Sequence, residues 1–133
     1  MSSTAILPEG CLDALHHVKE TREINTVILQ YGRAPAVLEV AAEANLTHDE
    51  LIHALPADEP RLVVHELCFA APDGARRNEQ LLILWVPPGA ISQEATYTDG
   101  YTALKELLTD VHVHLTARRT AQLEYRRLVA LAG

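Results

Sequence analysis

The sequence predicts a single α/β domain, residues 1–133, in which a mixed β-sheet is covered by helices on both faces. Segments with helical spacing alternate along the chain with segments rich in β-branched residues. Residues 81–86 are apolar at every position, which is typical of a central strand covered on two sides. The chain has 133 residues, 48% of them hydrophobic, which is enough for one core without a metal or a disulfide.

The first third of the chain predicts a helix followed by a β-hairpin. Pro8 opens a stretch in which apolar residues recur at helical spacing, so residues 8–19 are expected to form an amphipathic helix. Residues 24–31 are rich in β-branched side chains and end at the breaker Gly32-Arg33-Ala34-Pro35. The strand pattern resumes over residues 36–41, which completes the hairpin.

A second helix is expected over residues 47–55. Thr47 and Glu50 have the spacing of a capping box, in which the threonine accepts from a backbone amide and the glutamate reaches back. Pro56 cannot continue this helix.

Residues 61–70 and 80–86 are the strongest strand candidates. The turn residues Pro72-Asp73-Gly74 lie between them, which predicts an antiparallel pair.

The last third predicts a helix, a short strand and a final helix. After the strand-ending Pro87-Pro88-Gly89, a helix is expected from Asp99 onward. Residues 111–115 are expected to form the strand, and Thr120 to cap the last helix. The inward-facing residues are predicted to be Tyr101, Leu104, Leu108 and Val111 on the first helix and Ala121, Tyr125 and Leu128 on the second.

The formal charge of −7 argues against nucleic acid or an anionic membrane as the partner, because both require clustered positive charge. No apolar run approaches the roughly 20 residues of a membrane span. The start of the chain has no basic stretch followed by a long apolar one, so we expect no secretory signal. The charge is uneven, since residues 117–133 carry four arginines against the single Glu124.

Cys11 and Cys68 are the only cysteines in the sequence. We expect both to be reduced thiols in the core, because the chain is large enough to fold without a disulfide. One disulfide between them is the alternative.

Histidines are the first candidates for chemistry. His112 and His114 are two apart on a predicted strand and would point the same way, as zinc ligands sometimes do. No cysteine or carboxylate at a familiar spacing joins them, so we favour exposed strand histidines. The sequence also lacks a Gly-x-Ser-x-Gly elbow and a glycine-rich phosphate loop. It therefore predicts no catalytic site, metal or cofactor, and a small enzyme or zinc protein using His112 and His114 remains the rival hypothesis.

The predicted helix within residues 92–110 has a polar outer face. An ordinary solvated face and a partner-docking face both fit this pattern, and from the spacing alone the solvated face is favoured. The outer residues are Gln93, Glu94, Asp99, Thr102, Lys105 and Glu106.

Four segments carry a resemblance to a known family. They are Leu55 to Arg61, Leu84-Trp85-Val86-Pro87, Tyr97 with Ala103 and Leu104, and Leu123-Glu124-Tyr125. In the same order, they resemble four features of the actin-depolymerising-factor homology (ADF-H) family. These features are the leucine-proline start of a central strand, its tryptophan-x-proline end, the long-helix motif and the start of the last helix. The match spans nearly the whole chain.

The resemblance implies a five-stranded mixed sheet flanked by helices, in a non-enzymatic cytoplasmic monomer without a cofactor that binds actin or actin-related subunits. In relatives, the long helix and the N-terminal tail enter a cleft between two actin subdomains. The residues implied for that docking surface are Ser3, Thr4, Glu94, Ala95, Tyr97, Tyr101 and Lys105. Those implied for a second, filament-side surface are Arg76, Arg77, Arg126 and Arg127. Ser3 falls where cofilins are phosphorylated, which makes it a candidate for control by added negative charge.

Residues that depart from the family pattern help to decide which branch of the family the chain resembles more. Cofilins carry a basic residue where this chain has Glu94 and a lysine where it has Tyr101. Because actin's surface is acidic, Glu94 predicts a like-charge contact and weak cofilin-type binding. Pro60-Arg61 resembles the glia maturation factor branch, which binds the actin-related-protein (Arp) complex that seeds filament branches. The Arp complex is therefore ranked first, and cofilin-like binding of actin with weak depolymerising activity, favoured by Trp85 and Pro87, is the alternative.

Overall fold

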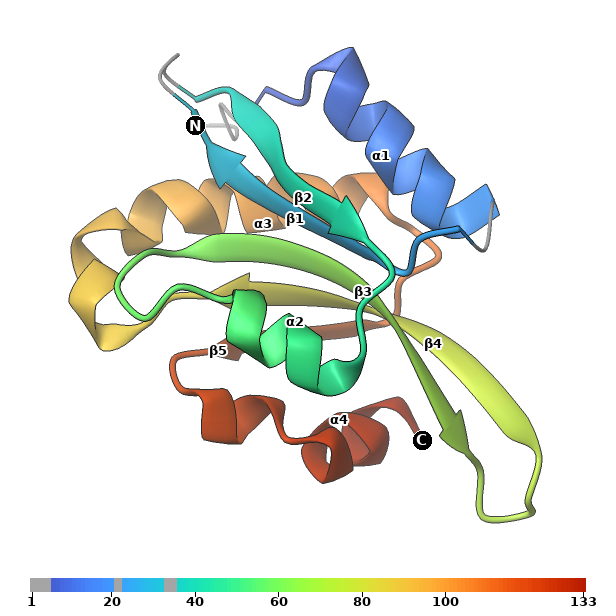
Figure 1. Cartoon of the computed structure of the whole chain (residues 1–133). Coiled ribbons are helices and arrows are strands. Elements are labelled where there is room, and N and C mark those ends of the chain that lie inside the picture. Colours follow the sequence, from blue (N-terminus) through green and yellow to red (C-terminus); the bar gives the residue numbers. More distant parts are fainter. Residues whose placement is uncertain (1–5, 21–22, 33–35) are drawn as a thin grey trace.

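The computed structural model describes residues 6–20, 23–32 and 36–133, and it confirms the predicted five-stranded mixed sheet with helices on both faces (Figure 1). The strand order is β2-β1-β3-β4-β5, and β5 alone pairs in parallel, with β4. The elements in chain order are α1 (Glu9–Glu20), β1 (Thr26–Tyr31), β2 (Leu38–Ala44), α2 (His48–Ala54), β3 (Arg61–Ala70), β4 (Arg76–Trp85), η1 (Pro88–Gln93), α3 (Glu94–Leu107), β5 (Val113–Ala117), η2 (Thr120–Leu123) and α4 (Tyr125–Ala132).

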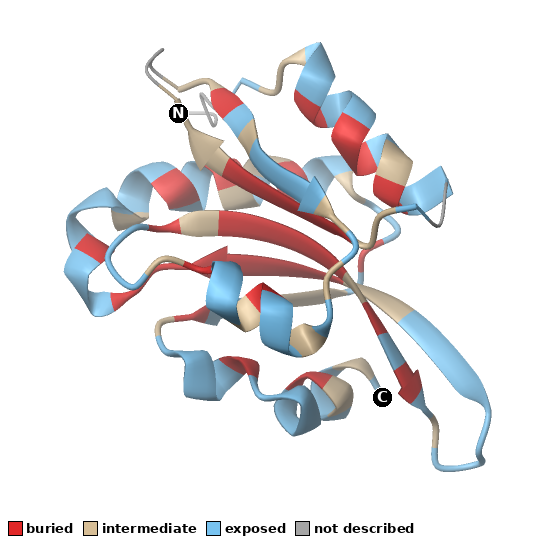
Figure 2. Cartoon of the chain, in the orientation of Figure 1, coloured by how far each residue is buried: buried red, intermediate tan, exposed pale blue. Residues whose placement is uncertain are grey.

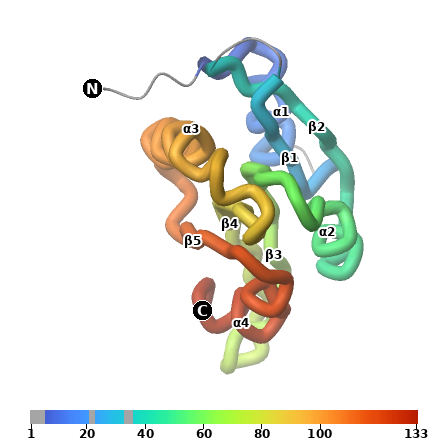
Figure 3. Tube along the Cα trace, turned by 90° about the vertical axis from the view of Figure 1, so that its left-hand side faces the viewer, coloured from blue at the N-terminus to red at the C-terminus, as the bar shows by residue number. Residues whose placement is uncertain are grey.

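Two hydrophobic clusters lie on opposite faces of the sheet, because successive strand residues point to opposite sides. On one face, Leu82 and Leu84 of β4 pack with residues of α1 and α3. On the other face, Leu81 and Ile83 pack with residues of α2, η2 and α4. Figure 2 shows this buried centre on β1, β3 and β4, and Figure 3 shows the same layers after a turn of 90°. The expectation that residues 81–86 are covered on both faces is therefore confirmed.

The capping box of α2 is present as expected. The Glu50 amide donates to Thr47 Oγ1 at 3.1 Å, and the Thr47 amide donates to Glu50 Oε1 at 2.9 Å. After α2, Trp85 Nε1 donates to the Pro56 carbonyl at 2.8 Å. The tryptophan thereby ties the end of β4 to the chain that leads into β3.

The β3–β4 hairpin is longer than predicted. β4 begins at Arg76, and its first residues pair with the end of β3 beyond the rest of the sheet (Figure 1). The first part of this strand was not predicted, because it contains the polar segment Arg77-Asn78-Glu79. Cys68 lies in the projecting part and is exposed, so the prediction of a core thiol is wrong for Cys68 and confirmed for Cys11. Both cysteines are free.

The long helix α3 starts at Glu94, five residues before the expected Asp99, and follows the 3-10 turn η1. Its interior contains Gly100, a poor helix former that weakened the helical pattern. A Cβ atom there would lie 2.8 Å from Leu62 Cδ1 and 2.9 Å from the Tyr31 hydroxyl oxygen. Glycine therefore lets α3 approach the sheet closely.

The end of the chain departs most from expectation. Thr120 begins η2 and does not cap α4, which starts at Tyr125. The Gln122 side chain instead caps the start of η2, because its Oε1 accepts from the amides of Arg118 and Arg119 at 2.6 and 3.1 Å. The expected inward residues Ala121 and Tyr125 are exposed, whereas Leu123 and Leu128 are buried.

Candidate functional site

The outer face of α3 is the first candidate for a functional surface. The helix buries Tyr97, Gly100 and Leu104 against the sheet, at the spacing of one helical face. On the opposite side, a ridge of small exposed residues runs through Ala95, Thr98 and Thr102, with exposed residues Asp99, Lys105 and Glu106 beside it. A ridge of small side chains allows the backbone of a partner to come close.

Tyr97 was expected on this surface, but it is only 4% exposed and belongs to the core. The Tyr31 amide donates to the Tyr97 hydroxyl oxygen at 3.0 Å, and the two rings meet edge to face at 5.0 Å between centroids. Tyr97 therefore positions α3 on the end of β1 and is unavailable to a partner.

Tyr101 is half-buried and packs against the same core cluster. Burial raises the pKa of its phenol. Lys105 Nζ lies 5.2 Å from the centroid of the Tyr101 ring, within cation–π distance. Tyr101 and Lys105 thus form one side of the outer face, and they remain candidates for contact with a partner.

Glu94 is the first residue of α3 and is held by Arg118, which follows β5. The guanidinium donates from Nη1 and Nη2 to the two carboxylate oxygens at 2.7 and 2.9 Å. The hydrogen bonds from Arg118 keep the pKa of Glu94 below its ordinary value. Sequence analysis missed Arg118 as a site residue, because the cluster of arginines gave no sign of which one turns toward α3.

The base of the N-terminal leader lies at the same end of the sheet. Ile6 forms a parallel bridge with Val37, in which the Ile6 amide donates to the Ala36 carbonyl at 2.6 Å and the Ile6 carbonyl accepts from Leu38 at 2.9 Å. This bridge adjoins the end of β1, where Tyr31 contacts α3. Ser3 and Thr4, expected to join the docking surface, lie outside the described residues.

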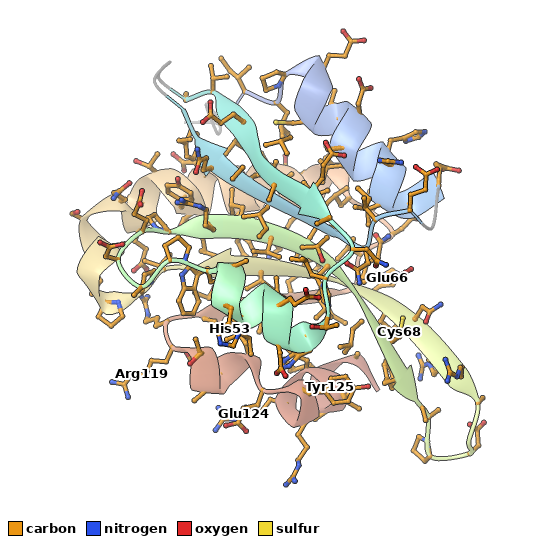
Figure 4. All side chains as sticks on the ribbon, viewed as in Figure 1. His53, Glu66, Cys68, Arg119, Glu124 and Tyr125 are labelled. Atoms are coloured by element: carbon orange, nitrogen blue, oxygen red, sulfur yellow. The ribbon has the colours of Figure 1, made fainter. Side chains whose placement is uncertain are left out.

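A second surface combines the projecting hairpin with α4. The Tyr125 hydroxyl donates to the Cys68 carbonyl at 2.7 Å, and both residues are labelled in Figure 4. A cavity of about 210 Å³ lies here, lined by Cys68, Phe69, Ala70, Arg76, Arg77, Asn78 and Tyr125. Arg77 donates to Glu79 at 2.8 Å and lies 5.7 Å from the Phe69 ring centroid.

Arg126 and Arg127 are exposed on α4, as Arg76 and Arg77 are on the hairpin. The structure thus brings the four predicted arginines to two neighbouring elements, and α4 contacts β3 directly.

For the rival zinc hypothesis, the part of the chain that the structure describes supplies no third ligand to His112 and His114. His114 lies on β5, and His112 is exposed just before that strand. Within residues 6–20, 23–32 and 36–133, no three histidine, cysteine, aspartate or glutamate side chains are grouped so that they could hold a metal ion. In the same ranges, no helix is long and apolar enough to cross a membrane.

Comparisons with known proteins agree with the fold. The sequence profile of the family described as "Cofilin/tropomyosin-type actin-binding protein" matches residues 4–131. Actophorin of Entamoeba histolytica is 27% identical over 100 residues, which cover 74% of this chain and 72% of actophorin. The crystal structure of Streptomyces griseoflavus cofilin matches with a TM-score of 0.87 at 20% identity, covering 97% of each chain. Coactosin from Entamoeba histolytica matches with a TM-score of 0.81 at 18% identity, covering 96% of this chain and 94% of coactosin.

Proposed function

The chain belongs to the cofilin/tropomyosin-type actin-binding protein family, and from this premise we propose that it binds an actin subunit through the outer face of α3 and the adjoining leader. Proteins of this family are non-enzymatic regulators that bind actin. The observation that carries the proposal is the division of α3 into a buried face and an exposed ridge of small residues, beside the bridge at Ile6.

A helix presented in this way suits insertion into a groove of a partner protein. The inner face is anchored by Tyr97 and Gly100, so the helix is held rigidly and loses little freedom on binding. The outer ridge carries no large side chain at Ala95, Thr98 or Thr102 that would keep a partner at a distance.

Actin itself now ranks ahead of the Arp complex as the proposed partner. The sequence-based preference for the Arp complex rested mainly on the negative charge of Glu94 at the docking helix, beside the departure at Tyr101 and the resemblance at Pro60-Arg61. The bidentate pair with Arg118 offsets that charge within the molecule. The expected repulsion between Glu94 and the acidic surface of actin is therefore much smaller.

Binding to the Arp complex is the second candidate, and one observation favours it. The outer face of α3 carries two carboxylates, Asp99 and Glu106, and one lysine, Lys105. A partner less acidic than actin would meet this face with less repulsion.

The hairpin and α4 are proposed to contact a second subunit in a filament. Their exposed arginines, Arg76, Arg77, Arg126 and Arg127, stand out in a chain with a net charge of −7. Together, the two surfaces suit a cytoplasmic protein that works at the cytoskeleton as a monomer. Phosphorylation of Ser3 would add negative charge to the leader and is proposed to weaken docking.

The proposal is tested by measuring the affinity of the full chain for actin monomer, actin filaments and purified Arp complex in parallel. Ala95→Trp places a large ring on the ridge and is expected to weaken actin binding roughly tenfold or more, which corresponds to about 1.4 kcal/mol. Ala54→Trp is the matched control, because Ala54 is an exposed alanine on α2, on the other face of the sheet.

Equal loss of binding in both tryptophan variants would refute docking through α3. Binding to the Arp complex without binding to actin would promote the second candidate to first. Removal of residues 1–5 is expected to weaken binding of the same partner, and thermal unfolding verifies that the shortened chain is folded.

A further inference from the structure

The Glu94–Arg118 pair lies at the margin of the proposed docking face. Glu94 opens α3 and immediately precedes Ala95 of the exposed ridge. The pair has bidentate geometry, and its side chains are 35% and 41% exposed for Glu94 and Arg118 respectively. A partner that contacts the first turn of α3 therefore meets both side chains together.

Two features keep Glu94 ionised at this position. The N-terminus of a helix favours negative charge. The two hydrogen bonds from Arg118 favour the carboxylate over the neutral acid. Without Arg118, the first turn of α3 would present an uncompensated negative charge to the partner.

We infer that Arg118 is a specificity-determining residue of the docking surface, which cancels the charge of Glu94 and so admits an acidic partner to the first turn of α3. This inference rests on the proposed function. Arg118 comes from the segment after β5, 24 residues away in sequence from Glu94. The electrostatic character of the docking helix is thus set by a residue outside the helix.

The net charge at this point can be varied in single steps while the backbone is kept. The pair is neutral in the natural protein, negative in Arg118→Gln, positive in Glu94→Gln and neutral again in the double variant. If the partner surface is acidic, affinity for actin monomer should follow this charge. Glu94→Gln is expected to bind most tightly and Arg118→Gln most weakly. The natural protein and the double variant should bind about equally, between the two.

Each unit of charge is expected to change the affinity by about three- to tenfold at low salt. The differences should shrink as salt is raised, because exposed charges are screened. Rescue of Arg118→Gln by Glu94→Gln is the decisive readout, since a merely structural role of Arg118 would leave the double variant as weak as the single one.

A second ion pair supplies the control. Lys19 and Asp110 pair on the surface at the other end of α3, with 53% and 63% of their side chains exposed. Lys19→Gln is expected to leave actin affinity unchanged. Thermal unfolding of every variant verifies that it is folded.

Equal affinity of all four Glu94 and Arg118 proteins would overturn the inference and leave the proposed function standing. A double variant as weak as Arg118→Gln would also overturn it. Failure of the natural protein to bind actin at all would instead refute the proposed function.

Discussion

At the scale of single residues, the absence of a Cβ atom at Gly100 lets α3, the helix proposed to dock, pack closely on the sheet. Gly100→Ala is expected to destabilise the protein by about 1–2 kcal/mol, because overpacking against Leu62 and Tyr31 outweighs the better helix propensity of alanine. Urea unfolding measures the change. Gly10→Ala is the matched control, since a Cβ at Gly10 in α1 meets nothing within 4 Å. It should be neutral or stabilising, and a destabilised Gly10→Ala would remove the steric explanation.

A buried histidine gives a second prediction at this scale. His65 is 3% exposed, and its Nδ1 lies 2.8 Å from the hydroxyl oxygen of Thr26 on the neighbouring strand β1. Thr26 in turn donates to Asn25 Oδ1 at 2.7 Å. Burial, and to a lesser degree the charge of His48, lowers the pKa of His65 from 6.5 to about 4.

Because the pKa of His65 is lowered in the folded protein, this histidine binds a proton in the unfolded chain at a pH where it stays neutral in the folded protein. The contribution of His65 to stability is full above about pH 6.5 and is lost as the pH falls toward about 4, with a total of roughly 3 kcal/mol. Urea unfolding between pH 7 and pH 5 should show a decline that His65→Gln reduces. His53→Gln, at an exposed site labelled in Figure 4, should keep the decline. An unchanged slope in His65→Gln would contradict this assignment.

At the scale of elements, the first residues of β4 extend the β3–β4 hairpin beyond the rest of the sheet and are exposed. Arg76 is exposed there, so Arg76→Gln is expected to lower filament affinity roughly threefold, since an exposed ion pair contributes at most about 1 kcal/mol. Binding of actin monomer should not change. Cosedimentation with filaments and a monomer-binding assay measure the two effects.

Arg119→Gln removes another exposed arginine, outside the hairpin and α4, and serves as the control for the loss of one charge. The same loss of filament binding in both variants would mean that overall charge, and not the hairpin, is responsible.

Elements were predictable where local and tertiary preferences agree. The capping box of α2 and the apolar second half of β4 follow from their residues alone. The start of α3 was misplaced, because Thr96, Tyr97 and Thr98 before Asp99 are weak helix formers, and the packing of Tyr97 against Tyr31 overrides that preference. The first half of β4 was missed, because polar residues form a strand only when the end of β3 pairs with them.

At the scale of the whole molecule, the sequence predicted the polar outer face of α3, where Asp99, Thr102, Lys105 and Glu106 are exposed, but not the contacts that tie this helix to distant segments. Tyr97 was assigned to the partner and instead belongs to the core, because its role depends on Tyr31, which is distant in sequence. Arg118 was overlooked for the same reason, since its pairing with Glu94 exists only after β5 has joined the sheet. Contacts between segments that are distant in the sequence could not be predicted from the spacing of residues along the chain.

The parallel pairing of β5 with β4 has a consequence for the order in which the chain assembles. Two antiparallel strands that are joined by a tight turn can pair directly from that turn. Two parallel strands can pair only when the crossover segment between them brings them side by side. In this chain that crossover consists of η1 and α3. The edge strand β5 is therefore expected to join the sheet with or after the packing of α3, so a chain in which α3 has not yet packed is also expected to lack β5.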